Sequence, residues 1–322
     1  MKLSLKNWFV AGIAVAIATV GAAGHAQAAA KYRIAYIARA QGDSFAAWLA
    51  NAVVKETKKY PDMSVNVFDG QSRNDLIESH IENAVQNKFD LLIIQPYDPA
   101  IQIGPVKKAM AKGMKVIATN PKFADDSVPS VDANPYDQGA VNAKYALTLV
   151  PQKAQVVVLL GPPGNPHSMG RRDAWQKEFF DKRKDVKIVA EQTANWNKDE
   201  AMALTEDWVQ SHPKIDAVIS MNDNMAAGAI EALKGSGAKA FPQVYGVDGT
   251  AEACLLIKDG KMTSTALQNA NALAEKSVKL ANDMLTDDPK DLHQTIPAEL
   301  ITKDNIDKYI ELHKQLGDIK LK

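Results

Sequence analysis

The stretch Ala217–Leu233, AVISMNDNMAAGAIEAL, carries the strongest information about the fold of this chain. Its first four residues, Ala217–Ser220, have the apolar character of a parallel strand that is covered on both faces. From Asn224 onward, small and apolar residues recur at helical spacing. We expect Asn224 to cap this helix and Asp223 to serve its N-terminus. The stretch therefore predicts a strand that leads directly into a helix, the repeating unit of an α/β fold.

The same alternation extends in both directions along the chain. Further strands are predicted at residues 33–37, 65–68, 91–94, 115–118, 155–160, 186–190, 244–247 and 262–267. Further helices are predicted at residues 45–60, 75–87, 106–111, 135–149, 169–183, 200–210, 251–258, 271–285 and 305–316. Alternating strands and helices imply parallel sheets with right-handed crossovers. The alternation of strands and helices begins again after residues 130–135, where we expect the chain to cross tightly from one lobe to the next. We therefore predict two doubly wound, Rossmann-like lobes.

The first 28 residues have the features of a cleavable signal peptide. Lys2 and Lys6 precede the apolar run Trp8–Val20, and Ala26-Gln27-Ala28 fits a small-x-small cleavage pattern. The alternative is a membrane anchor, but the run is short for the hydrocarbon core and no basic cluster follows it. We therefore predict export to the periplasm. The remaining 294 residues, 29–322, are more than one core usually organises, which also favours two domains.

Charge and cysteine content exclude several classes of protein. Beyond the leader the chain has 36 basic and 38 acidic residues. It therefore lacks the excess of positive charge with which proteins bind nucleic acid or an acidic membrane surface. Cys254 is the single cysteine, so no disulfide can form within the chain, and its apolar surroundings indicate a buried thiol. No set of histidine, cysteine and acidic residues in the sequence has the spacing of a zinc site. We predict no metal and no cofactor.

Polar and aromatic residues follow one predicted strand after another. Ligands of open α/β sheets bind beyond the carboxyl ends of the strands, which makes these residues the candidate site. The candidates are Asp43, Phe45, Asn120, Arg171, Trp196, Asn222, Asp248 and Gln268. Amides and carboxylates can pair with hydroxyl groups, and aromatic faces pack on the C–H faces of a sugar. The set therefore predicts a neutral polyhydroxylated ligand.

Five of the candidates also have an ordinary structural interpretation. Asp43 could be a helix cap, and Asn222 and Asp248 could be turn residues. Trp196 could belong to the core, and Arg171 could be solvated or structural. The recurrence of such residues at successive strand ends favours a binding site over these separate explanations.

Four segments of the chain resemble one known family. The stretch 217–233 is similar to that family's strand-N-D-x-M-A-x-G-A-x-x-A-L segment, and 245–250 (YGVDGT) is similar to its G-x-D-G-T turn. Residues 259–268 (DGKMTSTALQ) and 95–100 (QPYDPA) resemble two further motifs. From Arg33 to about Pro297, the chain resembles the type I, ribose-binding-like periplasmic binding proteins of sugar importers.

The resemblance implies two lobes joined by three crossings, one comprising residues 29–134 and 269–297, the other residues 135–268 and 298–322. It implies that hinge closure traps a sugar or polyol between the lobes, and that the closed protein, a monomer, docks on the membrane permease of an ABC importer. Position by position, Asn222, Asp248 and Gln268 match the family's partners of sugar hydroxyls. Trp196 and Phe45 match its aromatic contacts, and Asp43 stands where an asparagine is common.

Two departures from the family pattern affect the expected ligand. Asn120-Pro121 replaces an Asp-Arg pair that grips the sugar, and Met169 stands in place of an arginine, with Arg171 matching a second, more structural arginine. We therefore expect the first lobe to lack this charged clamp and the ligand to be a smaller or open-chain polyol or another hydroxylated metabolite. The long loop 161–168, with three prolines, is expected to reshape the pocket. Arg39 leaves one question open, since an anionic ligand becomes possible if this side chain reaches the cleft.

Other functional classes fit the sequence less well. An enzyme is disfavoured because the chain has no G-x-S-x-G, no H-E-x-x-H and no recognisable histidine triad, so we predict no catalytic residues. A transcription factor of this fold carries an N-terminal DNA-binding helix pair, where this chain has a signal peptide. A periplasmic sensor that presents its bound state to a receptor kinase or chemoreceptor is the alternative that the sequence leaves open.

Overall fold

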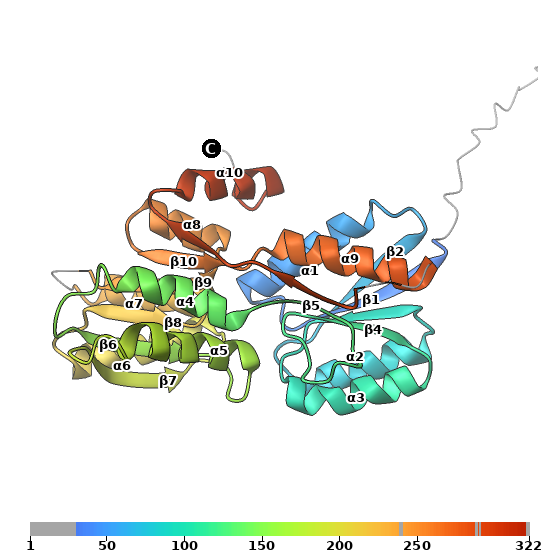
Figure 1. The fold of residues 1–322 in the computed structure, drawn as a ribbon, viewed down its shortest axis with the longest axis horizontal. Coiled ribbons are helices and arrows are strands. Elements are labelled where there is room, and N and C mark those ends of the chain that lie inside the picture. The colour runs from blue at the N-terminus through green and yellow to red at the C-terminus, as the bar shows by residue number, and fades with distance from the viewer. Residues whose placement is uncertain (1–29, 238–240, 287–288, 290, 320–322) are drawn as a thin grey trace, which may run out of the picture.

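The computed structural model describes residues 30–237, 241–286, 289 and 291–319, so the predicted signal peptide lies outside the described residues. The described chain forms two six-stranded sheets that lie in two lobes side by side (Figure 1). The strand order is β11-β5-β4-β3-β1-β2 in one sheet and β12-β10-β9-β8-β6-β7 in the other. The predicted fold class, two doubly wound α/β lobes, is confirmed.

The first sheet is wholly parallel. Its strands are β1 (Tyr32–Ala38), β2 (Met63–Asp69), β3 (Leu91–Ile94), β4 (Lys115–Thr119), β5 (Ser130–Ala133) and β11 (His293–Ile296). Its helices are α1 (Ser44–Thr57), α2 (Asn74–Gln86), α3 (Pro99–Ala111) and α9 (Ala270–Thr286). Because side chains alternate along a strand, Ile34 and Tyr36 belong to the core under α1 and α9, and Ala35 and Ile37 to the core under α2 and α3.

The second sheet is parallel except at one edge. Its strands are β6 (Gln155–Leu160), β7 (Lys187–Thr193), β8 (Ala217–Ser220), β9 (Gln243–Asp248), β10 (Ser264–Leu267) and β12 (Glu299–Thr302), which runs antiparallel to β10. Its helices are α4 (Pro135–Ala146), α5 (Pro166–Trp175), α6 (Lys198–Ser211), α7 (Asp223–Gly235), α8 (Ala251–Lys258) and α10 (Ile306–Leu316). A π-helical turn, Gln176–Phe180, extends α5. Helix α4 packs on α5, α6 on α7, and α8 on α10.

The chain passes from one sheet to the other at three places. These places lie between β5 and α4, between β10 and α9, and between β11 and β12 (Figure 1). Strands β5 and β10 therefore lead directly out of their sheets at the side where the lobes meet. This arrangement brings the ends of strands from both lobes to one shared region.

Three details of the sequence-based prediction were wrong. Helix α3 begins at Pro99 rather than residue 106 and contains Pro105, and α5 begins at Pro166 rather than residue 169. In both helices the first residue is proline, whose missing N–H is no loss in the first turn. The short strands β5, β11 and β12 were not predicted, because four residues carry too little pattern to reveal a long-range pairing.

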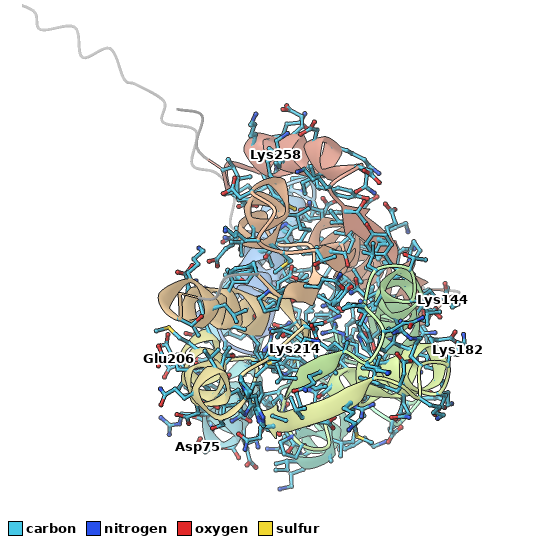
Figure 2. All side chains as sticks on the ribbon, turned by 90° about the vertical axis from the view of Figure 1, so that its left-hand side faces the viewer. Asp75, Lys144, Lys182, Glu206, Lys214 and Lys258 are labelled. Carbon is cyan, nitrogen blue, oxygen red and sulfur yellow. The ribbon has the colours of Figure 1, made fainter. Side chains whose placement is uncertain are left out.

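Charged side chains of both signs are spread over the surface. The labelled residues Asp75, Lys144, Lys182, Glu206 and Lys258 are exposed and lie around the outside of the molecule (Figure 2). Charged side chains that are buried between the lobes therefore stand apart from the general pattern and call for a specific explanation. None of the described helices is long and apolar enough to cross a membrane.

Candidate functional site

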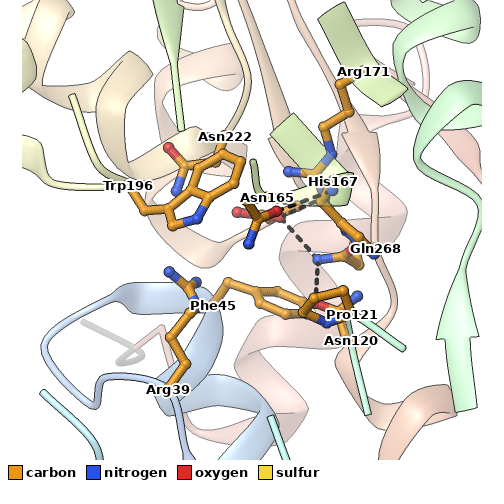
Figure 3. Close-up of a pocket in the computed structure, with 11 residues that line it drawn as sticks. Arg39, Phe45, Asn120, Pro121, Asn165, His167, Arg171, Trp196, Asn222 and Gln268 are labelled. Carbon is orange, nitrogen blue, oxygen red and sulfur yellow. Dashed lines mark hydrogen bonds and ion pairs between the residues drawn. The ribbon is translucent and has the colours of Figure 1, made fainter. Parts of the chain in front are cut away.

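A pocket lies where the strand ends of the two lobes face each other (Figure 3). Its cavity volume is about 20 Å³, which is room for about one water molecule. Its lining residues are Arg39, Phe45, Asn120, Pro121, Asn165, His167, Arg171, Trp196, Asn222, Asp248 and Gln268. The first four belong to the lobe of the first sheet and the others to the second sheet and its helices.

Seven of the eight candidate residues from the sequence line this pocket. The eighth, Asp43, lies directly behind the lining residue Arg39, whose Nη2 contacts Asp43 Oδ1 at 2.7 Å. Asp43 is also the N-cap of α1, where Oδ1 accepts a hydrogen bond from the amide of Ala46. Both interpretations of Asp43, as a cap and as part of the site, therefore fit the structure. Sequence reasoning missed Asn165 and His167 and left Arg39 undecided.

Gln268 ties one end of the pocket together. It follows β10, and its Nε2 donates to Asp248 Oδ1 at 3.2 Å and to Asn120 Oδ1 at 3.3 Å. Its Oε1 accepts hydrogen bonds from Gln138 at 2.8 Å and from Arg171 at 2.9 Å. Because both amide atoms are engaged, Gln268 fixes the position of Asp248 against Asn120, which belongs to the lobe of the other sheet. Gln268 and Asn120 are labelled in Figure 3.

Arg171 is held almost entirely by the protein. Its Nε donates to Gln138 Oε1, and its Nη1 donates to the carbonyl of Met221 at 2.6 Å. Its Nη2 reaches Gln268 and lies 3.2 Å from His167 Nδ1. The side chain is buried, in contrast to the neighbouring exposed Met169. Arg171 thus supports the second lobe's wall and presents its charge toward Asp248, 3.8 Å away.

Two side chains at the start of α5 reach across to the first lobe. Asn165 caps α5 and donates from Nδ2 to the carbonyl of Tyr97 at 3.1 Å. His167 Nε2 lies 2.9 Å from Asp132 Oδ1 in β5. The expected long loop 161–168 is therefore shorter than predicted, because helix α5 begins at Pro166 within it. The dipeptide Asn165-Pro166, an N-cap followed by proline, is the signal that could have revealed this start.

Asn222 has two roles in the structure. It is the N-cap of α7, accepting from the amide of Met225 at 2.9 Å, and its Nδ2 lies 3.4 Å from Asp43 Oδ2 on the other lobe. The expectation that Asn224 caps this helix was wrong, since Asn224 instead donates to the carbonyl of Trp196 at 2.8 Å. This bond holds the Trp196 backbone, which has a left-handed φ of 64°. The buried Trp196 ring is thereby positioned in the pocket wall.

The first lobe places a charged group in the cleft, although Asn120-Pro121 stands where the family has its Asp-Arg pair. Arg39 follows β1 and reaches the pocket from that lobe (Figure 3), with its guanidinium 5.9 Å from the centre of the Trp196 ring. The guanidinium of Arg171 lies 5.6 Å from the same ring. Trp196 is therefore within the range of cation–π attraction of one cation from each lobe.

Comparison with known proteins identifies the family. The family model described as a periplasmic binding protein domain matches residues 34–289. The chain belongs to the type I periplasmic sugar-binding proteins of ABC importers. It is 29% identical over 236 residues to a xylitol-binding protein of Mycolicibacterium smegmatis, covering 72% of this chain and 67% of that protein. It is 29% identical over 253 residues to a ribose import binding protein of Bacillus subtilis, covering 78% and 80%.

A solved structure shows the same architecture. An ABC transporter solute-binding protein from Bacillus halodurans C-125, with bound myo-inositol, superimposes with a TM-score of 0.82 at 26% identity. The match covers 87% of this chain and 98% of that one. Members of this family are solute-binding proteins rather than enzymes.

The carboxylate of Asp248 has a strongly perturbed environment in this binding protein. Burial raises the pKa of Asp248 well above its ordinary value, and Arg171 partly opposes this rise. The nearby buried Asp223 and Asp43 raise it further. Burial likewise lowers the pKa of Arg171, although a guanidinium keeps its proton at any physiological pH. Asp248 is therefore suited both to accept a hydrogen bond from a hydroxyl and, when protonated, to donate one.

The described residues contain no group of three or more histidine, cysteine or acidic side chains placed to hold a metal ion. Cys254 is buried, as its sequence context indicated. What the pocket offers is a set of donors and acceptors with two aromatic faces, Phe45 and Trp196. Such a set can bind a polyhydroxylated molecule through its hydroxyls and its C–H faces together.

Proposed function

We propose that this protein binds a small, uncharged sugar or polyol between its lobes, without changing it chemically, and delivers it to the permease of an ABC importer. In this proposal residues 29–134 with 269–297 form one lobe and residues 135–268 with 298–322 the other, joined by a three-crossing hinge. The lobes close over the ligand, and the protein acts as a monomer in the periplasm after removal of residues 1–28.

The observation that carries the proposal is the division of the pocket between the lobes. Arg39, Phe45 and Asn120 come from one lobe, and the facing wall comes from the other. A ligand that touches both walls binds the closed form more tightly than the open form, so it shifts the protein toward closure. Because the closed form then exists mainly with ligand bound, a permease that recognises the closed form receives loaded protein.

The balance of charge supports an uncharged ligand. Each arginine of the pocket has a carboxylate close by, Asp43 at 2.7 Å from Arg39 and Asp248 at 3.8 Å from Arg171. Neither cation therefore needs an anionic ligand for neutralisation. The ligands that the relatives and the solved structure are named for, xylitol, ribose and myo-inositol, are all uncharged and polyhydroxylated.

The binding test uses protein expressed with its own leader and recovered from the periplasm. After unfolding and refolding to remove any carried ligand, its melting temperature is measured against pentoses, hexoses, acyclic polyols, cyclitols and sugar acids. A ligand at a hundred times its dissociation constant adds about 2.7 kcal/mol to the free energy of unfolding, which raises the melting temperature of a protein of this size by about 4 °C. We expect a shift with one or a few neutral members and none with Asp248→Asn, while the exposed variant Asp75→Asn keeps the response.

Two results would contradict the proposal. A shift with sugar acids alone would assign the site to an anionic ligand, and no shift with any member would remove the sugar and polyol assignment. The transport step needs a separate measurement, uptake of the identified ligand by cells that lack this gene. Loss of uptake supports the importer role, whereas normal uptake by these cells would favour a sensory role.

A further inference from the structure

The ion pair of Arg39 and Asp43 is buried in the pocket wall. Arg39 Nη2 lies 2.7 Å from Asp43 Oδ1, and the two side chains are 8% and 5% exposed. A buried ion pair contributes little to stability on balance, because desolvation of both charges offsets their attraction. Capping of α1 does not require the pair either, since asparagine caps a helix as well as aspartate does. The pair therefore calls for an explanation beyond folding.

One edge of the Arg39 guanidinium is left without a partner. Its Nη1 is buried and has no hydrogen-bond partner among the described residues. Arg39 lines the pocket and points toward Trp196 of the opposite lobe (Figure 3). A buried donor without an acceptor is costly, and native proteins seldom retain one. An oxygen atom of a molecule bound in the pocket would satisfy it.

We propose that Arg39 is a specificity-determining residue, whose Nη1 donates a hydrogen bond to a hydroxyl oxygen of the ligand. Asp43 neutralises the charge of Arg39, and we call this pair the Arg39–Asp43 clamp. Because the clamp is neutral, the site accepts a ligand hydroxyl at Nη1 and rejects a ligand carboxylate there. This inference rests on the proposed function and adds to it the group that selects the charge of the ligand.

The rejection of acids follows from the position of Asp43. A ligand carboxylate on Nη1 would share one guanidinium with the carboxylate of Asp43, whose other oxygen lies 3.4 Å from Nδ2 of the lining residue Asn222. Two like charges held near each other in a water-poor site repel strongly. A hydroxyl carries no charge and can accept from Nη1 without this cost. The Asp43 carboxylate is thus the element that excludes acids.

Two substitutions separate the parts of this clamp. Asp43→Asn keeps the helix cap but leaves the charge of Arg39 uncompensated, so it should admit acids. Arg39→Lys keeps the positive charge beside Asp43 but removes the forked donor geometry, so it should weaken neutral ligands without admitting acids. The exposed pair Arg73 and Asp75, in the same lobe, supplies the matched controls Arg73→Lys and Asp75→Asn.

The experiment compares matched pairs of probes by calorimetry at one ionic strength. Xylitol is compared with D-xylonate, and D-glucose with D-glucuronate, because each acid differs from its partner mainly by one carboxylate. We expect the wild type to bind a neutral probe and neither acid. Arg39→Lys should lose about tenfold to a hundredfold in neutral affinity, the effect of one hydrogen bond to a charged group. Asp43→Asn alone should gain measurable acid binding.

Several outcomes would overturn the inference. Tighter binding of an acid than of its neutral partner by the wild type contradicts it, as does unchanged neutral affinity in Arg39→Lys. If the wild type binds a neutral probe while Asp43→Asn gains no acid, the inference fails and the proposed function stands. If the wild type binds no neutral sugar or polyol of the full panel named above, both the proposed function and the inference fail.

Discussion

His167 and Asp132 join the two lobes through a hydrogen bond of 2.9 Å between the imidazole Nε2 and the carboxylate Oδ1. The histidine lies in the first turn of α5 and the aspartate in β5. Arg171 Nη2 faces the other ring nitrogen at 3.2 Å, and a guanidinium can only donate. Nδ1 of His167 is therefore the acceptor, which places the proton on Nε2, pointing at Asp132. This bond is an interlobe link that involves no ligand atom.

The first prediction concerns this link. His167→Ala removes the bond, while Asp132 keeps the amides of Lys122 and Ala133 as donors and Arg171 keeps Gln268. In the proposed mechanism the closed form is then less stable relative to the open form. We therefore expect the identified ligand to bind about tenfold more weakly. At one ligand concentration near the wild-type dissociation constant, small-angle scattering should show a larger radius of gyration for the variant than for the wild type.

His212→Ala is the control, since His212 lies at the end of α6, outside the pocket lining. A variant at His167 with unchanged affinity and unchanged scattering would remove the link from the closing mechanism.

The second prediction concerns Gly161, which packs against the Trp196 ring. A Cβ at position 161 would lie 2.3 Å from the nearest ring atom, so the ring or the backbone must move. We expect Gly161→Ala to cost about 1–3 kcal/mol in free energy of unfolding and to weaken ligand binding, because the displaced ring lines the pocket. Chemical denaturation and calorimetry measure the two effects. Gly104→Ala is the control, since that position in α3 has open space and alanine favours the helix. A Gly161 variant with wild-type stability would contradict the packing argument.

The third prediction concerns Asn222, which lies 3.4 Å from Asp43 across the cleft. Asn222→Asp keeps an oxygen for the N-cap of α7, so we expect the free energy of unfolding to change little at neutral pH. The same change places two carboxylates against each other when the lobes close, which disfavours closure. Ligand affinity should therefore fall, and more steeply at pH 8 than at pH 5, in calorimetric titrations. An affinity equal to that of the wild type at both pH values would contradict this reading of the contact.

The site was predicted from the sequence to the extent that strand ends define it. Parallel strands end at the same edge of a sheet, so Asn222, Asp248 and Gln268, at the ends of β8, β9 and β10, come together in the pocket wall. Asn120 follows β4 of the other sheet and lines the pocket from the facing lobe. His167 was missed because the start of α5 was placed three residues too late. Arg39 could not be assigned, because the direction of a long side chain depends on its partner, here Asp43. Strands β11 and β12 depend on pairing with strands that are distant in the chain, which no local pattern reveals.

A second buried carboxylate, Asp223, supports the turn that carries Asp248. Its Oδ1 accepts from Thr265 Oγ1 at 2.6 Å, and its Oδ2 accepts from the amide of Thr250 at 2.9 Å. Burial raises the pKa of Asp223 to about 6, although the hydrogen bonds from Thr265 and Thr250 oppose this rise. Gly246 leaves room for this arrangement, since a Cβ there would lie 2.3 Å from Asp223 Oδ1.

The last prediction is the pH dependence that Asp223 gives to stability. The ordinary pKa of this carboxyl is 3.8 and its pKa in the folded protein is about 6, so between these values the folded state holds a proton that the unfolded state has released. The free energy of unfolding therefore falls as pH rises through this interval, by about 3 kcal/mol from this group. Asp223→Asn is neutral at every pH and can still accept from the Thr250 amide, so it lacks this contribution. Urea denaturation from pH 4 to pH 7 should show wild-type stability falling relative to Asp223→Asn, whereas the exposed Asp75→Asn should show no such fall. A wild-type advantage that stays constant or grows with pH would mean that Asp223 is ionised throughout, held by its hydrogen bonds against the cost of burial.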